Sequence, residues 1–190
     1  MKTLIDKITI QTRITEMASE IDFYYCGQDW YRHTQEPVII IGVLTGAIFF
    51  MADLVRQLSI RTKLDFIRVS TYPVMEPIQC FGQKKLSKIM TGLESDIIAK
   101  PMSQMHNSRV LTIDDILDTG LTYQAIRAHL FQSGSKDIRL ATLLRKPGKA
   151  PKHIKADFVG FDIGDEWVAG YGMDDRHGRQ REVQCVFVDE

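Results

Sequence analysis

Cysteine, net charge and long apolar runs are all scarce in this sequence, and each absence excludes a class of protein. Only Cys26, Cys80 and Cys185 occur among the 190 residues, with no C-x-x-C pair, so neither a disulfide framework nor a zinc site is expected. The 24 basic and 24 acidic side chains cancel, which leaves no overall positive field to attract nucleic acid or anionic lipid. We therefore expect a reduced, cytoplasmic protein without a nucleic-acid or membrane partner.

No apolar segment is long enough to span a bilayer. The best candidate, VIIIGVLTGAIFFMA at 38–52, is shorter than the ~20 residues that a spanning helix needs and is interrupted by two glycines and a threonine. The amino terminus carries Asp6 and Lys7 where a signal peptide would be apolar. With 44% apolar residues the chain can fill one substantial core. We expect a single domain over residues 1–190.

The spacing of apolar residues predicts alternating strands and helices around a central, mainly parallel sheet, which is an α/β fold. We expect strands at 38–44, 64–69, 109–113 and 138–144, and helices at 47–58 and 121–132. Near the amino terminus, apolar residues at three- and four-residue steps predict a further helix: Ile10, Ile14, Met17, Ala18, Ile21 and Tyr25.

Two other segments have a different character. The connection at 72–108 is long enough to be functional, to be disordered or to carry structure of its own. After Pro147 come short apolar segments separated by glycine and aspartate, which predict a small β-rich C-terminal hood. We therefore expect a core at about 37–147 and a hood at about 150–190 together with the N-terminal segment.

The segment VLTIDDILDTGLT at 110–122 carries the clearest chemistry. Ligands of open α/β sheets bind at the carboxyl ends of the strands, and this strand delivers Asp114, Asp115 and Asp118 to that edge. The following Thr-Gly-Leu-Thr opens a helix whose free N–H groups and two hydroxyls can hold an anion. The segment lacks the G-x-x-x-x-G-K-[ST] pattern, so it is no P-loop. Adjacent carboxylates suit sugar hydroxyls, Mg²⁺ or a developing positive charge.

This ordered pattern resembles the type I phosphoribosyltransferase signature, although a bare Asp-Thr-Gly is also common at helix starts. Three further segments resemble the hypoxanthine-guanine phosphoribosyltransferases in the same order: IGVLTGAIFFMADL at 41–54, LATLLRKP at 140–147 and DFVGFDIGDEWVAGYGMD at 157–174. The resemblance implies a type I phosphoribosyltransferase fold and purine salvage. The expected substrates are phosphoribosyl diphosphate and a 6-oxopurine, hypoxanthine and guanine, with IMP or GMP plus diphosphate as products.

On the phosphoribosyl side, the resemblance assigns Asp114 and Asp115 to the ribose hydroxyls with Mg²⁺ nearby. It assigns Asp118 to purine N7 as the general base, although a helix N-cap would also account for an aspartate there. It assigns binding of the 5-phosphate to the turn and helix start that follow: Thr119, Gly120, Leu121 and Thr122.

On the purine side, Lys146 is expected to donate to the 6-oxo oxygen, a contact that the amino group of adenine could not accept. A solvated lysine at a strand end is the alternative. The resemblance implies that the backbone of Val159 contacts the edge of the purine and that Trp167 stacks on its ring. It also places Ile116 beside the base.

The diphosphate side carries two departures from the family. The family's Leu-Lys-Gly turn has a threonine in place of the lysine, and the Ser-Tyr-Gly start of the mobile loop becomes Ser-Thr-Tyr-Pro. The resemblance assigns diphosphate binding to Thr45, Gly46 and Arg179, and it places Thr71 and Tyr72 in the mobile loop. It assigns Mg²⁺ binding to Asp165 together with Asp114 and Asp115.

Two alternatives stay open at this point. The first alternative is a xanthine-preferring phosphoribosyltransferase, because the hood determines which substituent at purine C2 is accepted. A phosphoribosyltransferase-like regulator that binds RNA is the other, and the zero net charge counts against it. The resemblance also implies a homodimer or homotetramer.

Overall fold

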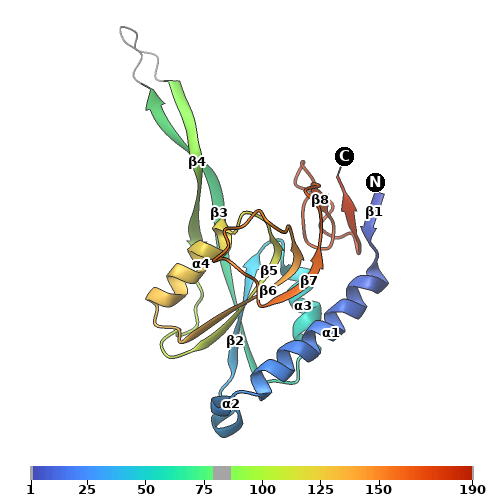
Figure 1. Cartoon of the computed structure of the whole chain (residues 1–190), viewed down its shortest axis with the longest axis vertical. Helices are drawn as coiled ribbons and strands as arrows, with labels where there is room; N and C mark the ends of the chain where they lie inside the picture. The colour runs from blue at the N-terminus through green and yellow to red at the C-terminus, as the bar shows by residue number, and fades with distance from the viewer. Residues whose placement is uncertain (1, 79–86, 190) are drawn as a thin grey trace.

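The computed structural model describes residues 2–78 and 87–189, with side chains described outside 70–96. A six-stranded sheet has the order β4-β3-β2-β5-β6-β7, and all neighbouring pairs are parallel except β3 with β4. Figure 1 shows the whole chain. The main-sheet strands and the helices are β2 (Val38–Leu44), β3 (Thr62–Ile78), β4 (Ser87–Ala99), β5 (Arg109–Leu117), β6 (Asp137–Arg145), β7 (Phe158–Asp162), α1 (Lys7–Cys26), α2 (Asp29–Thr34), α3 (Ile48–Val55) and α4 (Leu121–Gln132).

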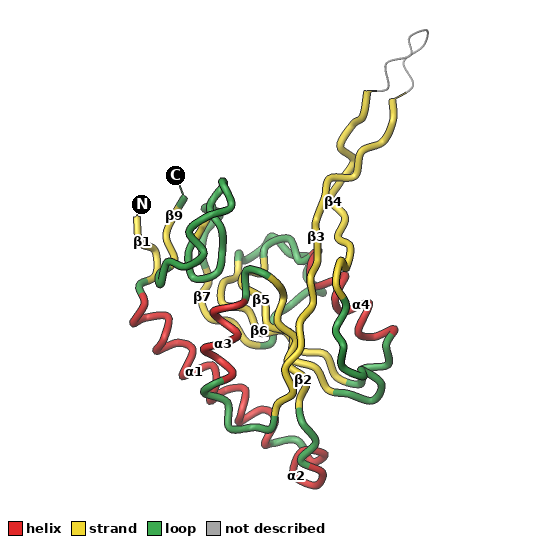
Figure 2. The backbone as a smooth tube through the Cα atoms, turned by 180° about the vertical axis from the view of Figure 1, so that it is seen from behind, coloured by secondary structure: helices red, strands yellow, loops and turns green. Residues whose placement is uncertain are grey.

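Helices cover both faces of this sheet, because its strands are apolar on both sides. Successive side chains of a strand point to opposite faces. In β2, Val38 and Ile40 belong to the core cluster under α1 and α3, whereas Ile39 and Ile41 belong to the cluster under α4. The tube in Figure 2 shows α1 and α3 together and α4 apart from them. The predicted α/β class with a mainly parallel sheet is confirmed.

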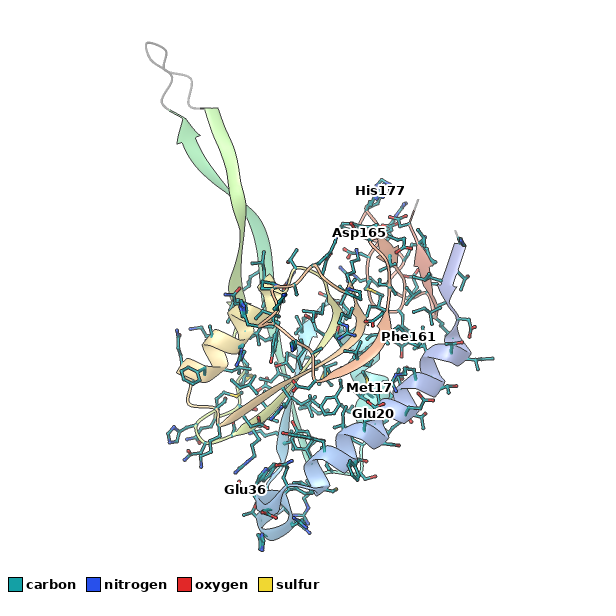
Figure 3. All side chains as sticks on the ribbon, viewed as in Figure 1. Met17, Glu20, Glu36, Phe161, Asp165 and His177 are labelled. Carbon is teal, nitrogen blue, oxygen red and sulfur yellow. The ribbon has the colours of Figure 1, made fainter. Side chains whose placement is uncertain are left out.

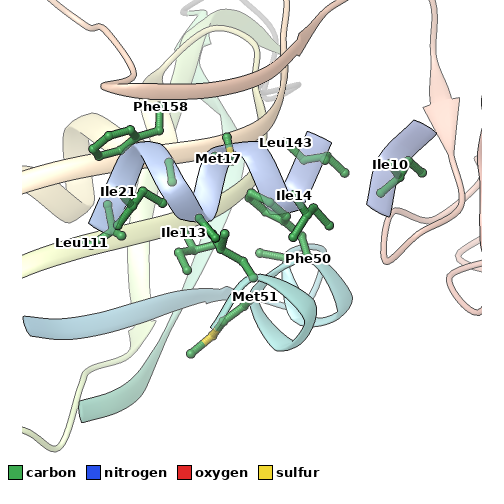
Figure 4. Packing of buried hydrophobic residues seen from close by; sticks show 14 of the residues in the cluster. Ile10, Ile14, Met17, Ile21, Phe50, Met51, Leu111, Ile113, Leu143 and Phe158 are labelled. Atoms are coloured by element: carbon green, nitrogen blue, oxygen red, sulfur yellow. The ribbon is translucent and has the colours of Figure 1, made fainter. Parts of the chain in front are cut away.

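The long helix α1 supplies much of the larger core cluster. All six of the apolar residues that predicted it are buried, with exposed fractions of 2% or less. Figure 4 shows Ile14, Met17 and Ile21 packed with Phe50 and Phe158. Such interdigitation is typical of a close-packed interior.

Several boundaries differ from the prediction. The strand β5 was expected to end at 113 but continues to Leu117, because it stays paired with β6 as far as the Leu117 and Arg145 partners. The predicted helix at 47–58 spans only 48–55. The connection after 72 is mostly a long β3–β4 hairpin, whose described part projects beyond the rest of the molecule (Figures 1 and 2).

Both ends of the chain meet in a second, three-stranded antiparallel sheet. Its order is β1-β9-β8, formed by β1 (Lys2–Ile5), β9 (Val186–Val188) and β8 (Val168–Ala169). In contrast, β7 of the expected hood joins the main sheet parallel to β6. No helix in the described ranges is both long and apolar enough to cross a membrane.

Candidate functional site

A cleft of about 270 Å³ lies at the carboxyl ends of β2 and β5. The β2–α3 turn, the end of β5 and the start of α4 form most of its wall, and the C-terminal tail closes it with Asp174 and Arg181. Eight residues that the sequence assigned to a site line this cleft together: Gly46, Asp114, Asp115, Ile116, Asp118, Thr119, Gly120 and Thr122.

The paired carboxylates of Asp114 and Asp115 sit in β5, not in a loop. The Asp115 N–H donates to Asp114 Oδ1 at 3.0 Å, and the Ile116 N–H donates to Asp115 Oδ1 at 2.9 Å. Burial raises the pKa of Asp114 well above its ordinary value, and the neighbouring charge of Asp115 raises it further. Burial also raises the pKa of Asp115, while Arg181 opposes that effect. Two adjacent acids, Asp114 buried and Asp115 partly buried, are prepared to bind hydroxyl donors or a cation.

Two glycines bring the β2–α3 turn and the C-terminal tail against this pair. A Cβ at Gly46 would overlap Asp115 Oδ2, and a Cβ at Gly172 would overlap the Gly46 carbonyl oxygen. The peptide bond between Leu44 and Thr45 is cis. Thr45 itself is exposed and does not line the cleft.

The start of α4 has the features that favour anion binding. Gly120 is the N-cap residue and has a φ of 80°. It has no side chain to accept hydrogen bonds from the first N–H groups of α4, so these groups remain free for a ligand. Thr119 and Thr122 add hydroxyls at the cleft. Since Gly120 is the cap, the alternative interpretation of Asp118 as the N-cap is wrong.

Asp118 instead faces two lysines. Lys146 Nζ lies 3.6 Å from Asp118 Oδ2 and 3.8 Å from Asp165 Oδ1, and only 8% of its side chain is exposed. Lys149, which sequence reasoning missed, lies 3.4 Å from Asp118 Oδ1 and also pairs with Asp165. Asp118 Oδ1 is nevertheless buried without a hydrogen-bond donor among the described residues. The interpretation of Lys146 as a solvated strand-end lysine is wrong.

The tail places its arginines differently from the sequence assignment. Arg179 has a side chain 67% exposed and pairs with Asp175 at 3.3 Å, outside the cleft lining. Arg181, two residues further on, reaches the cleft. Its Nη2 pairs with Asp174 at 2.7 Å and its Nη1 donates to the Gly172 carbonyl at 2.6 Å.

The remaining purine-side and loop residues lie in different surroundings. The Val159 carbonyl accepts a hydrogen bond from Arg13 of α1 at 2.8 Å, and Val159 is not among the residues that line the cleft. Trp167 is 53% exposed and therefore available for stacking. Thr71 and Tyr72 lie within β3, and their side chains are outside the described residues.

The donor set fits a magnesium ion that is shared with substrate. No cluster of three or more potential protein ligands occurs among the described side chains. Magnesium is commonly held by one or two carboxylates together with water and phosphate oxygens. The carboxylates of Asp114 and Asp115 meet this requirement, whereas Asp165 is engaged by lysines and lies with the hood (Figure 3). Asp174, which sequence reasoning missed, adds a carboxylate from the tail to the cleft wall.

Comparison with known proteins identifies the class. The family model of the phosphoribosyl transferase domain matches residues 9–176, so the chain belongs to the phosphoribosyltransferase family. Its fold is the type I fold of that family, and the resemblance inferred from the sequence is confirmed.

Within the family, this chain is similar to proteins named hypoxanthine-guanine or hypoxanthine phosphoribosyltransferase. The hypoxanthine-guanine phosphoribosyltransferase of Aquifex aeolicus is 35% identical over 176 residues, covering 92% of this chain and 86% of that protein. The hypoxanthine phosphoribosyltransferase of Escherichia coli is 30% identical over 174 residues, covering 92% and 87%. A crystal structure of a Staphylococcus aureus hypoxanthine phosphoribosyltransferase has a TM-score of 0.80 and 30% identity, covering 100% and 91%.

Proposed function

We propose that this chain transfers the 5-phosphoribosyl group from phosphoribosyl diphosphate to hypoxanthine or guanine, giving IMP or GMP and diphosphate in purine salvage. One observation carries the proposal. A pair of adjacent carboxylates, a helix start with free N–H groups and a carboxylate facing a buried lysine meet at the carboxyl end of β5. A purine nucleotide has one part for each of these features: a ribose for the carboxylate pair, a phosphate for the helix start and a base for the carboxylate and lysine.

Asp118 is the group that takes the proton. Its Oδ1 is buried and accepts no hydrogen bond from the described residues, so it can accept from N7 of a base that attacks through N9. Lys146 and Lys149 face the same carboxylate, at 3.6 and 3.4 Å. General-base catalysis of this kind is typically worth ~10²–10⁴-fold.

Lys146 selects the base. Its ammonium is almost fully buried between Asp118 and Asp165, and a lysine can donate but not accept. It therefore suits the 6-oxo oxygen of hypoxanthine or guanine and disfavours the 6-amino group of adenine. The exposed ring of Trp167 is the candidate for stacking on the base.

The carboxylates stabilise the ribose as it gains oxocarbenium character. Asp114 and Asp115 hold the ribose hydroxyls, and their charges favour the positive transition state. Magnesium, when bound beside them, neutralises the negative charge of diphosphate. On the leaving-group side, we assign the arginine role to Arg181 because it, and not Arg179, lines the cleft.

Substitution of Asp118 tests the mechanism. The Asp118→Asn variant keeps the size and loses the base, so we expect kcat to fall about tenfold or more. A matched control is Asp162→Asn, which removes a half-exposed carboxylate paired with Arg145 on the surface. Nucleotide formation is measured with phosphoribosyl diphosphate, Mg²⁺ and each of hypoxanthine, guanine, xanthine and adenine.

Each result of that assay has a definite meaning. Turnover of hypoxanthine or guanine by the unmodified chain, lost in Asp118→Asn but not in Asp162→Asn, supports the proposal. Turnover of xanthine alone would move the chain to the xanthine-preferring class. No product with any base would contradict an enzymatic function and favour a regulator.

A further inference from the structure

A second cleft, of about 620 Å³, lies at the opposite end of the main sheet from the catalytic site. Its lining comes from α4, from the first residues of β6 and from the segment that precedes β7. The nine residues of β6 separate this end from the end that bears Lys146, a distance of about 26 Å at the usual rise of a strand. Tyr123 of α4 lines both clefts, but none of the cations of this cleft lines the first one.

The cleft concentrates positive charge in a chain whose net charge is zero. Its two carboxylates are both engaged by Arg139, which contacts Asp137 at 3.0 Å and Asp157 at 2.8 Å. Asp157 also accepts from the Leu140 N–H at 2.9 Å. Four other cations line the cleft, and none forms an ion pair with any residue in the described ranges: Arg127, Lys136, Lys152 and Lys155.

An aromatic side chain accompanies these cations. Phe131 of α4 is 74% exposed and lines the same cleft. An apolar ring beside unpaired cations can stack on a planar group while the cations hold phosphates. Four cations around one cavity provide more charge than a monoanion requires.

We propose that this cleft binds a small polyphosphorylated anion. Arg127, Lys136, Lys152 and Lys155 contact its phosphate oxygens, and Phe131 provides a surface for an attached base. Two sources share this chemistry, a nucleoside triphosphate and an inorganic polyphosphate. Stacking on Phe131 distinguishes them, because only the nucleotide has a ring.

Calorimetric titration with ATP and with inorganic tripolyphosphate, both without Mg²⁺ and at low salt, tests the site. The cleft variant is Lys136→Glu with Lys152→Glu. The matched control is Lys2→Glu with Lys63→Glu, which changes net charge equally at two exposed lysines outside the cleft. We expect the cleft variant to bind either probe about tenfold more weakly or worse, and the control to bind as the unmodified chain does.

The Phe131→Ala variant identifies the source. A nucleotide site predicts that ATP binds more tightly than tripolyphosphate and that Phe131→Ala removes this advantage. Equal affinities, unaffected by Phe131→Ala, assign the site to inorganic polyphosphate. Absence of binding to the unmodified chain, or equal loss in the cleft and control variants, would overturn the proposal. So would tighter binding of a short single-stranded RNA through the same lysines.

Discussion

Gly172 of the C-terminal tail packs against the β2–α3 turn, beside the proposed diphosphate side of the cleft. Gly172 has a φ of 104°, and a Cβ there would overlap the Gly46 carbonyl oxygen. Arg181 donates to the Gly172 carbonyl at 2.6 Å. An added methyl group must push the tail away from the turn, and Arg181 must move with it. We expect Gly172→Ala to weaken binding of phosphoribosyl diphosphate more than binding of the purine.

Gly178 gives this prediction a matched control. Its φ is 77°, but a Cβ added there would have no other atom within 4 Å, so alanine meets only the backbone penalty, about 1–2 kcal/mol. Gly172→Ala carries a similar penalty and adds an overpacking cost, typically ~1–3 kcal/mol. The free energy of unfolding should therefore fall by roughly 1–3 kcal/mol more in Gly172→Ala than in Gly178→Ala.

Urea unfolding and steady-state kinetics on both variants measure these effects. We expect the KM for phosphoribosyl diphosphate to rise about tenfold in Gly172→Ala, as a displaced charge-assisted contact implies, with the KM for hypoxanthine little changed. Equal unfolding free energies for the two variants, together with unchanged Michaelis constants, would show that the turn and tail do not constrain each other.

Three further predictions concern side chains around the same cleft. Arg181→Ala should raise the KM for phosphoribosyl diphosphate about tenfold, whereas Arg179→Ala should not; equal effects in steady-state kinetics would reject the assignment. Tyr171→Phe removes a 2.6 Å hydrogen bond to Asp53 and should lower the unfolding free energy by ~1–3 kcal/mol in urea titration; no change would mean that the bond is dispensable. Because the pKa of Asp114 is raised on folding, protonation favours the folded state, and that stability is lost as pH rises from the ordinary aspartate pKa through the raised one. Asp114→Asn should therefore be more stable than the unmodified chain at neutral pH without Mg²⁺. Unfolding measurements in acid should show no difference in stability between the two. A stability difference that does not depend on pH would contradict this reasoning.

Apolar periodicity predicted most of the fold because burial determines those elements directly. The bounds 38–44 and 121–132 agree with β2 and α4, and the six apolar residues of α1 are all buried. The same method ended β5 too early at 113. A polar Asp-Asp pair usually marks the end of a strand, but here pairing with β6 continues past it.

The candidate site was predictable where function depends on a continuous segment. The stretch from Asp114 to Thr122 forms one wall of the cleft, as its strand, turn and helix pattern predicted. Lys149 was missed because its position depends on how the turn after Pro147 folds back toward Asp118. Sequence order alone gives no such distance.

The tail shows why spacing fails as a guide to the diphosphate side. Asp175 accepts from the backbone N–H groups of His177 and Arg179, and this turn also pairs Asp175 with the Arg179 side chain. The chain then returns, and the Gly172 N–H donates to the Arg181 carbonyl at 2.8 Å. Counting residues from the family pattern selects one arginine, but the hydrogen bonds of the turn determine which arginine faces the cleft.

The same reasoning explains why glycines mark this site as clearly as its charged residues do. Gly46 lets Asp115 approach the β2–α3 turn, and Gly172 lets the tail approach Gly46. The tail and the turn thus meet through backbone atoms, and the Asp115 side chain packs against the turn, at positions where an added side chain would hold these segments apart. A sequence reveals each glycine but not its partner across the contact. The diphosphate side of the cleft, which is built from such contacts, consequently required the structure, whereas the ribose side, built from one strand and its turn, did not.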